Sequence, residues 1–381
     1  MNKADTSIEL LLTNLQAVLP DRILPQGALR IAGDKIAGFG LATPDQTPVT
    51  VDFAGDIVIP GLIDLHVHGC GGSDTMDASA TALENMATAL LQQGTTAFLA
   101  TTMTASPSRL QAVLSLGKIF HPTDWHAELL GFHMEGPCIS PDFHGAQNVS
   151  ELSEVPVPVN EWVKILTLAP ELSAARAYIE MAKNAGIILS AGHSGASYEQ
   201  MQIAIKEGVH YMTHAFNAMP GIHHRAPGML SAALLDRRVT IELIADGIHV
   251  HPAVLEMALR LKGAERVILV SDGTRAVGMP DGEYELGGQQ VRLHQGKMTL
   301  PDGTIAGSAK PLLAGVRFIT EVVGRPLHEA VRMATLNPAR LLGIDDCSGS
   351  LKPGAFATFL RLSPELELKE VWVRGHCRYS A

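Results

Sequence analysis

Ile57-Val58-Ile59-Pro60-Gly61-Leu62-Ile63-Asp64-Leu65-His66-Val67-His68-Gly69 is the stretch of sequence that decides the fold. Its apolar run predicts a buried β-strand over residues 57–65. Residues two apart on a strand point to the same side, so the imidazoles of His66 and His68 project together where the strand ends. Two neutral imidazoles on one face at a strand end are typical of a metal site.

The composition of the chain limits the classes of protein to which it can belong. Its 381 residues are enough for one large barrel domain and a small second domain. The formal net charge of −10 argues against sequence-independent binding to nucleic acid, which needs a basic surface. The four cysteines are scattered without CxxC spacing, and neither a signal peptide nor a membrane-length apolar stretch is visible. We therefore expect a cytoplasmic protein that does not bind membranes.

Strand-like and helix-like stretches alternate along most of the chain. Eight parallel strands with intervening helices form a (β/α)8 barrel of the TIM type, an α/β fold with its active residues at the C-terminal ends of the strands. The expected strands cover residues 57–65, 95–102, 127–134, 163–168, 187–192, 209–214, 239–245 and 266–271. Helical patterns between them include residues 79–93, 172–185, 197–207 and 252–262.

The two ends of the chain do not follow this alternation. They carry short strand-like pieces punctuated by Gly, Pro and Asp. We expect a small β-sandwich domain built from residues 1–56 and 344–381, beside a barrel domain of residues 57–343. A turn-rich insertion within residues 273–306 predicts further hairpins. The strand-like pieces at the ends cover residues 8–12, 29–31, 35–39, 356–362 and 368–374.

Polar residues able to bind a metal ion or to carry a proton follow these strands where each one ends. The C-terminal ends of all the strands meet at one end of a barrel, so these side chains are expected to lie together. A single such residue could have a structural role, but six at the same end indicate a site. The six are His66 and His68 after the first strand, Glu135 after the third, His193 after the fifth, His214 after the sixth and Asp272 after the eighth.

The residue types of this set indicate metal-assisted hydrolysis. Imidazole nitrogens with one carboxylate suit Zn²⁺ or Fe²⁺ and can leave a coordination position for water. A divalent ion lowers the pKa of that water and polarises a carbonyl oxygen. A separate carboxylate must accept the proton of the water and pass it to the leaving group, and Asp272 is the candidate for this role.

Longer motifs around these residues make the chain similar to a known family. They are Pro60 to Gly69 (PGLIDLHVHG), His133 to Pro137 (HMEGP), Ser190 to Ser194 (SAGHS), Thr213 to Pro220 (THAFNAMP), Ala245 to His249 (ADGIH), Ser271 to Gly273 (SDG) and Met333 to Arg340 (MATLNPAR). With these motifs the chain resembles the N-acetylglucosamine-6-phosphate deacetylases of the amidohydrolase superfamily over nearly its whole length. Glu135 is the most discriminating residue, because many relatives bridge their metals with a carboxylated lysine whereas the deacetylases use Glu in a Glu-Gly-Pro turn.

The resemblance implies a role for each of the six residues. Glu135, His193 and His214 correspond to the ligands of the principal metal ion. Asp272 corresponds to the general base that becomes the acid for the departing amine. Some deacetylases hold one ion and others can hold two, and the two histidines of the His-Val-His motif match the ligands of a second ion. One or two divalent ions per subunit are therefore expected.

The resemblance also implies which residues bind the substrate. Arg225 corresponds to an arginine that reaches the phosphate of the neighbouring subunit's substrate, which implies a homodimer, and a guanidinium can bind two phosphate oxygens. Gln147 stands where the family usually has a histidine that helps to polarise the acetyl carbonyl, so we expect Gln147 to contact the substrate without acid catalysis. The residues implied to bind substrate are Ala146, Gln147, Asn217, Ala218, Arg225, Asp246, His249, Ala306, Gly307 and Ser308.

The implied activity is metal-dependent hydrolysis of the acetamide of N-acetyl-D-glucosamine 6-phosphate to D-glucosamine 6-phosphate and acetate, in amino-sugar catabolism. The motifs do not distinguish the configuration at C4, so deacetylation of N-acetylgalactosamine 6-phosphate is the nearest alternative. A cyclic-amide hydrolase of the dihydroorotase kind is more distant, and Glu135 and Arg225 argue against it. A non-catalytic barrel scaffold would have lost ligands or the proton carrier, and all six residues are present.

Overall fold

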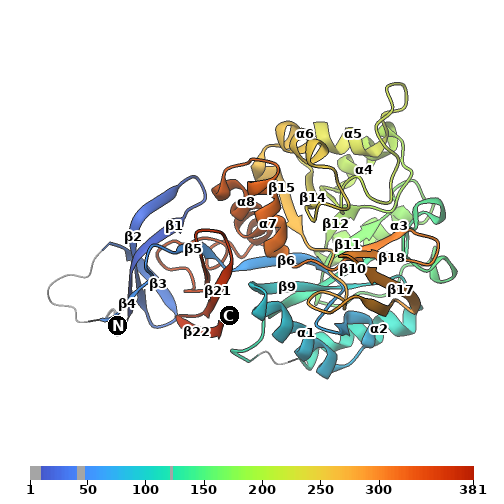
Figure 1. Ribbon diagram of the computed structural model, residues 1–381. Coiled ribbons are helices and arrows are strands. Elements are labelled where there is room, and N and C mark those ends of the chain that lie inside the picture. Colours follow the sequence, from blue (N-terminus) through green and yellow to red (C-terminus); the bar gives the residue numbers. More distant parts are fainter. Residues whose placement is uncertain (1–9, 41–47, 121–122) are drawn as a thin grey trace.

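A barrel of eight parallel strands forms the centre of the computed structural model, which describes residues 10–40, 48–120 and 123–381 (Figure 1). The barrel closes between its last and first strands, where the backbone N–H of Asp272 donates to the carbonyl of His66 at 3.0 Å. In order around the barrel the strands are β6 (Leu62–Val67), β9 (Thr95–Thr102), β10 (Glu128–Glu135), β11 (Val163–Leu168), β12 (Ile188–Ala191), β13 (Tyr211–Met212), β14 (Thr240–Ile244) and β15 (Val267–Val270). The α/β barrel fold that the sequence predicts is confirmed.

Helices surround the barrel and cover its outer face (Figure 1). Helix α4 begins where the sequence predicts, because Ser197 and Gln200 form a capping box, and it ends at Gly208, whose φ of 111° favours glycine. The described helices are α1 (Ala80–Gln92), α2 (Pro107–Ser115), α3 (Ala175–Ala185), α4 (Tyr198–Glu207), α5 (Gly228–Leu235), α6 (Pro252–Lys262), α7 (Leu312–Glu321), α8 (Leu327–Ala334) and α9 (Leu336–Leu341). None of these described helices combines the length and apolar character that crossing a membrane requires.

Both ends of the chain contribute to one further sheet, which lies beside the barrel (Figure 1). This sheet has its own apolar core, in which the rings of Phe359 and Trp372 stack with their centroids 5.4 Å apart. The division of the chain after residues 56 and 343 stays a prediction. The strands of this sheet are β1 (Leu10–Val18), β2 (Ile23–Ala32), β3 (Lys35–Phe39), β4 (Val49–Asp52), β5 (Ile57–Pro60), β20 (Phe359–Leu362), β21 (Leu368–Val373) and β22 (His376–Ser380).

The strand predicted over residues 57–65 is wrong in one respect, because the structure forms two strands there. Strand β5 pairs with β1 and β20 of the terminal sheet, whereas β6 pairs with β9 of the barrel. The change of partner falls at Gly61, whose N–H donates to Thr358 while that of Leu62 donates to Gly94. Periodicity reports burial and not the identity of the partner strand. In the strand expected over residues 8–12, residues 8 and 9 lie outside the described part of the chain.

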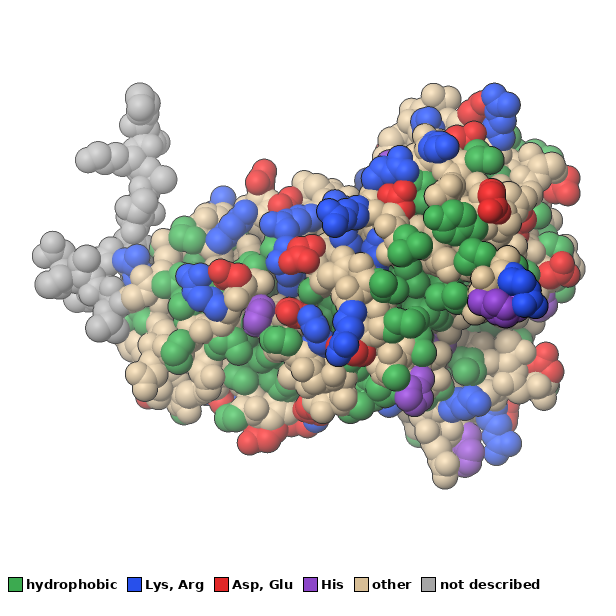
Figure 2. Space-filling model, turned by 90° about the horizontal axis from the view of Figure 1, so that it is seen from above, with side chains coloured by type: hydrophobic (Ala, Val, Ile, Leu, Met, Phe, Trp, Pro, Cys, Tyr) green, Lys and Arg blue, Asp and Glu red, His purple; other side chains and the backbone are tan. Residues whose placement is uncertain are grey.

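The insertion after β15 folds as the hairpins that the sequence predicts. Its four strands form an antiparallel sheet: β16 (Gly282–Leu286), β17 (Gln289–His294), β18 (Lys297–Thr299) and β19 (Ile305–Ser308). Smaller elements are the hairpin of β7 (Gly69–Cys70) and β8 (Ser73–Asp74), and the 3-10 helices η1 (Thr75–Asp77), η2 (Leu116–Lys118), η3 (Pro141–Phe143), η4 (Val149–Glu151) and η5 (Ala264–Arg266). Acidic and basic side chains are interspersed over the face of the molecule in Figure 2.

Candidate active site

The six residues selected at the strand ends lie together at the C-terminal end of the barrel. His66 lies in β6, Glu135 is the last residue of β10, and the others follow their strands by one or two residues. All six are buried, and none exposes more than 8% of its surface. A parallel barrel brings its strand ends to one rim, which explains why residues far apart in sequence meet here. The grouping that the sequence predicts is therefore present in the structure.

The carboxylate of Glu135 is the centre of the cluster. Its Oε1 lies 3.1 Å from Nε2 of His193 and 3.0 Å from Nε2 of His214. Its Oε2 lies 3.4 Å from Nε2 of His68. Since the two oxygens face different histidines, Glu135 can serve two ligand groups at once.

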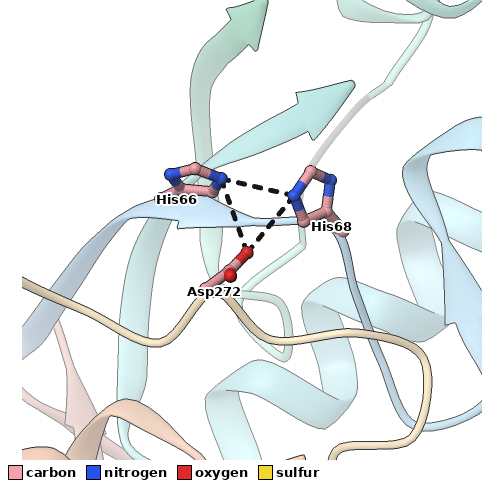
Figure 3. Close-up of side chains that lie close together, drawn as sticks. All are labelled: His66, His68 and Asp272. Carbon is pink, nitrogen blue, oxygen red and sulfur yellow. Dashed lines mark hydrogen bonds and ion pairs between the residues drawn. The ribbon is translucent and has the colours of Figure 1, made fainter. Parts of the chain in front are cut away.

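A second group of ligand atoms, shown in Figure 3, adjoins the first, because Nε2 of His66 lies 3.5 Å from Oε1 of Glu135. His66 and His68 of the first barrel strand approach Asp272, which follows the last one, and their side chains point toward one another. Nε2 of His66 lies 3.3 Å from Nε2 of His68 and 3.5 Å from Oδ1 of Asp272. Nε2 of His68 lies 3.3 Å from the same oxygen. The three atoms are close enough to one another to bind one ion.

The hydrogen bonds of the rings show which nitrogens can bind a metal ion. Nδ1 of His66 donates to Glu242 and Nδ1 of His193 to the carbonyl of Phe143, each at 3.0 Å, so Nε2 is the nitrogen of each ring whose lone pair can bind a metal ion. Nε2 of His66 lies 3.3 Å from Nε2 of His68. Nε2 of His193 lies 3.1 Å from Nε2 of His214. Two nitrogens that share a tetrahedral zinc ion are about 3.4 Å apart. The site therefore has groups that could hold a divalent metal ion.

The carboxylates of the cluster are ionised at neutral pH. Burial raises the pKa of Glu135, but the His66 and His193 rings more than offset it and hold this pKa well below its ordinary value. Burial likewise raises the pKa of Asp272, while the hydrogen bond with His68 and the charge of His66 bring it down to about 2. Ionised carboxylates are what a metal ligand and a proton acceptor require.

Three of the six residues have a backbone conformation that is uncommon for residues other than glycine. The φ angle is 48° at His193, 25° at His214 and 49° at Asp272. Such a conformation costs about 1–3 kcal/mol and persists where the surroundings fix it. After His193 the backbone is fixed by the carboxylate of Glu171. This carboxylate accepts from the hydroxyl of Ser194 and from the backbone N–H of Gly195, both at 2.6 Å.

A row of hydrogen bonds crosses the barrel interior beneath the site. Nδ1 of His133 lies 3.0 Å from the carbonyl of Leu65, which can only accept, so Nε2 of this ring accepts from the hydroxyl of Thr167 at 2.7 Å. Burial lowers the pKa of His133 to about 4, which keeps the ring neutral. The oxygen of Thr167 then accepts from Thr213, and that of Thr213 from Ser190, each at 2.6 Å. His133 thus supports the site without facing it.

Gln147 is held in one orientation by two hydrogen bonds. Its Oε1 accepts from the backbone N–H of Thr104 at 2.6 Å, so its amide nitrogen must point the other way. That nitrogen donates to Oε2 of Glu135 at 2.6 Å. Gln147 therefore fixes the central carboxylate, a contact that the sequence did not predict.

A cavity of about 390 Å³ opens above the cluster. Of the residues predicted to bind substrate, Asp246, Ala306 and Ser308 lie behind its wall, the last two because alternate residues of β19 face opposite sides. Arg225 lies on an exposed loop, where its Nη1 is 2.6 Å from Nε2 of His224. Those that line the cavity are Ala146, Gln147, Asn217, Ala218, His249 and Gly307.

His249 faces this cavity with a carboxylate behind it. Nδ1 of His249 lies 2.8 Å from Oδ2 of Asp246, which leaves Nε2 for a ligand. Burial lowers the pKa of His249, but Asp246 outweighs it, and the pKa is raised above its ordinary value. A protonated imidazole here can donate to an anionic or hydroxyl group of a ligand.

Sequence reasoning missed Glu242 and Glu171, which hold the cluster from behind. Glu242 accepts from His66 and from the backbone N–H of His214. A carboxylate inside the apolar strand predicted over residues 239–245 is itself a signal, because Glu is almost never fully buried without a partner. Glu171 lies in a loop and gives no comparable signal.

Comparison with known proteins places this site in a family. The sequence model of the family described as "Amidohydrolase family" matches residues 57–377 of this chain. The chain is 38% identical over 333 residues to the N-acetylglucosamine-6-phosphate deacetylase of Vibrio furnissii, which covers 85% of this chain and 83% of that protein. It is 36% identical over 351 residues to the N-acetylgalactosamine-6-phosphate deacetylase of Escherichia coli O157:H7, which covers 90% of this chain and 93% of that protein.

A solved structure agrees with these relatives. It is a mutant N-acetyl-D-glucosamine-6-phosphate deacetylase of Mycobacterium smegmatis in complex with N-acetyl-D-glucosamine-6-phosphate. Its TM-score to this chain is 0.90 at 31% identity, and the match covers 98% of this chain and 100% of that one. The chain therefore belongs to the amidohydrolase family and, within it, to the group of the N-acetylglucosamine-6-phosphate deacetylases.

Proposed function

We propose that this protein hydrolyses the acetamide of N-acetyl-D-glucosamine 6-phosphate to D-glucosamine 6-phosphate and acetate. The observation that carries the proposal is the convergence of four imidazole Nε2 atoms on Glu135 and Asp272 beside a cavity. Relatives named for this activity match most of the chain. Amide hydrolysis is a reaction that such a set of ligands and a proton carrier can catalyse.

The proposed ligands form two groups that share Glu135. Glu135, His193 and His214 would hold the principal ion, and His66 and His68 would hold a second. Zn²⁺ and Fe²⁺ suit nitrogen ligands combined with one carboxylate. When bound, the ion lowers the pKa of a water molecule and polarises the acetyl carbonyl.

Asp272 is the proposed proton carrier. Its ionised carboxylate accepts a proton from the attacking water as the water oxygen bonds to the carbonyl carbon. The same carboxylate then donates this proton to the nitrogen as the C–N bond breaks. Acetate and the free amine leave, and Asp272 returns to its ionised form.

The residues around the cavity are proposed to bind the sugar phosphate. Asn217 and Ala218 line the cavity next to His214 and would contact the phosphate. His249, with Asp246 behind it, would donate to a phosphate or sugar oxygen. Because Gln147 is already engaged by Glu135 and Thr104, its second amide hydrogen is the one left for the substrate.

The proposal includes a cytoplasmic homodimer in which Arg225 reaches the phosphate bound by the neighbouring subunit. The exposed position of Arg225 outside the cavity of its own subunit supports this arrangement. The four cysteines, all of which lie among the described residues, are unpaired, as expected in a reducing compartment.

The test is acetate release from the N-acetyl 6-phosphates of glucosamine, galactosamine and mannosamine, with the unphosphorylated sugars as controls. The glucosamine compound should give the highest kcat/KM, and removal of the phosphate should lower it strongly. The galactosamine epimer is the first competitor, because one relative is named for it. Preference for an unphosphorylated or cyclic amide would contradict the proposal.

A further inference from the structure

Glu242 lies in the barrel wall directly beneath the two groups of ligands. It is the third residue of β14 and is fully buried. Its Oε2 lies 3.0 Å from Nδ1 of His66 and accepts from the backbone N–H of His214 at 2.9 Å. One carboxylate oxygen thus contacts a ring of the second ligand group and the backbone of the first.

The contact between Glu242 and His66 sets this ring apart from the other three. Nδ1 of His193 donates to a neutral carbonyl, and Nδ1 of His68 and of His214 has no partner among the described residues. Within the described chain, His66 is therefore the ligand ring that a carboxylate backs. A carboxylate behind an imidazole fixes its tautomer and orientation and strengthens its other nitrogen as a metal ligand.

The balance of charge around Glu242 leads to the same conclusion. Glu135, Glu242 and Asp272 are buried carboxylates, and in the described ranges no Lys or Arg lies within ion-pair distance of any of them. A buried ion without a partner costs several kcal/mol. One divalent ion would leave a net charge of −1, whereas two ions would leave +1, so that none of the three carboxylates lacks a compensating positive charge.

We infer that Glu242 is a positioning residue that, through Nδ1 of His66, makes the cluster of His66, His68 and Asp272 a tight second ion site. The inference rests on the ligands proposed above. It differs from them because it says that the second group binds an ion tightly, and that this depends on a residue that touches neither ion nor substrate.

The test is zinc binding by the wild-type protein and by Glu242→Gln, each depleted of metal and titrated with Zn²⁺ against a chromogenic chelator. Glutamine keeps the size of the side chain and an oxygen that can accept both N–H groups, but removes the charge. Wild type should bind two zinc ions per subunit. Glu242→Gln should bind the first with unchanged affinity and the second 10- to 100-fold more weakly, the range typical for such partners.

Two further variants separate positioning from a general effect of charge. In a His66→Gln background, adding Glu242→Gln should not weaken the remaining zinc affinity further, because the ring through which Glu242 acts is gone. Asp64→Asn is the matched control, since Asp64 is also fully buried, in β6 itself, but accepts from the backbone N–H groups of His66 and Ser271. Asp64→Asn should weaken the binding of the second zinc ion far less than Glu242→Gln does.

Each outcome decides a separate point. A wild-type protein that binds no zinc would contradict the ligands of the proposed function itself. A single tight ion in wild type, or unchanged affinities in Glu242→Gln, would overturn only the present inference. Equal losses in Glu242→Gln and Asp64→Asn would overturn the positioning role of Glu242. If Glu242→Gln does not fold, the wild-type stoichiometry still decides the argument from charge.

Discussion

At the scale of single residues, Asp272 carries the sharpest prediction. Asp272→Asn keeps the size of the side chain but cannot accept a proton, so kcat should fall by about 10²- to 10⁴-fold. The ligands of the principal ion do not include Asp272, so that ion should remain. Acetate release and metal content measured on the same preparation check both statements.

The matched control for this prediction is Asp142→Asn. Asp142 also lines the cavity but belongs to neither group of ligands. Its substitution should leave kcat within a few-fold of wild type. A rate for Asp272→Asn within tenfold of wild type would remove Asp272 from the mechanism.

Some residues of the site could be predicted from the sequence, and others could not. The rule that active residues follow barrel strands selected His66, Glu135 and Asp272, because it depends only on where an apolar run ends. Glu242 lies in the middle of a strand, and its role depends on which neighbouring strand faces it. Gln147 was assigned to the substrate, but its contact with Glu135 arises from a loop path that no periodicity encodes.

At the scale of elements, Gly61 marks the point where the chain passes from β5 to β6. A Cβ there would meet Oγ1 of Thr96 and lie 2.8 Å from its Cγ2. Gly61→Ala should therefore lower the free energy of unfolding by about 1–3 kcal/mol, as overpacking does. Urea unfolding of Gly61→Ala, Thr96→Ala and the double variant measures the coupling. Strict additivity would show that the close approach to Thr96 is not the cause.

The N-terminus of η1 carries a prediction on pH. Burial is the main cause that raises the pKa of Asp74, the capping residue, from 3.8 to about 6. Between these values the folded protein binds more protons than the unfolded chain, so this residue's contribution to stability decreases as pH rises.

Asp74→Asn removes this dependence, since asparagine is neutral at every pH and is also a good capping residue. The free energy of unfolding of the variant, taken relative to that of wild type, should increase by about 1–2 kcal/mol from about pH 5 to about pH 7.5, at 1.36 kcal/mol per pKa unit. Urea unfolding of wild type and of Asp74→Asn at both pH values measures this gain. A gain that shrinks with rising pH would contradict the raised pKa.

Strand lengths also show the limits of prediction at this scale. The run predicted over residues 209–214 yields a strand of two residues, β13, because the backbone turns after Met212, where Thr213 joins the row of hydrogen bonds and His214 reaches Glu135. The run at residues 57–65 yields two strands in two sheets. Apolar runs predict which residues are buried, whereas hydrogen-bond partners are set by segments far away in sequence.

At the scale of the whole molecule, the proposed dimer predicts complementation between two inactive variants. Asp272→Asn lacks the proton carrier, and Arg225→Ala lacks the arginine that would serve the partner's site. In a mixed dimer, the site with an intact Asp272 receives Arg225 from the other subunit. Random mixing should restore about a quarter of wild-type activity, since half of the dimers are mixed and each has one complete site.

Coexpression of the two variants with different tags, followed by purification of the mixed dimer, tests this. The purified mixed dimer should have about half of wild-type activity, because one of its two sites is complete. The control is each variant alone, which should stay near its own low activity. No recovery in the mixed dimer would mean that Arg225 acts within its own subunit or not at all.

The overall architecture was largely predictable from the sequence, and the reason is physical. Parallel strands buried on both faces appear as continuous apolar runs, and helices between them appear as amphipathic stretches, so their alternation indicates a barrel. The shared strand-like composition of the two chain ends predicted that they combine in a small β-sandwich, and the described strands of both ends do meet, in one eight-stranded sheet. The order of strands within that sheet, where β5 lies between β1 and β20, depends on pairings that composition does not contain.

The row of hydrogen bonds beneath the site has a fixed direction of donation, which ends at the carbonyl of Leu65. Because the carbonyl of Leu65 can only accept, it determines the orientation of every donor from His133 to Ser190. The hydroxyl groups therefore donate head to tail along the row, from Ser190 to Thr213, from Thr213 to Thr167 and from Thr167 to His133, and none can reverse unless the others reverse with it. The row acts as one cooperative unit, and its polarity is set by the residue that precedes His66.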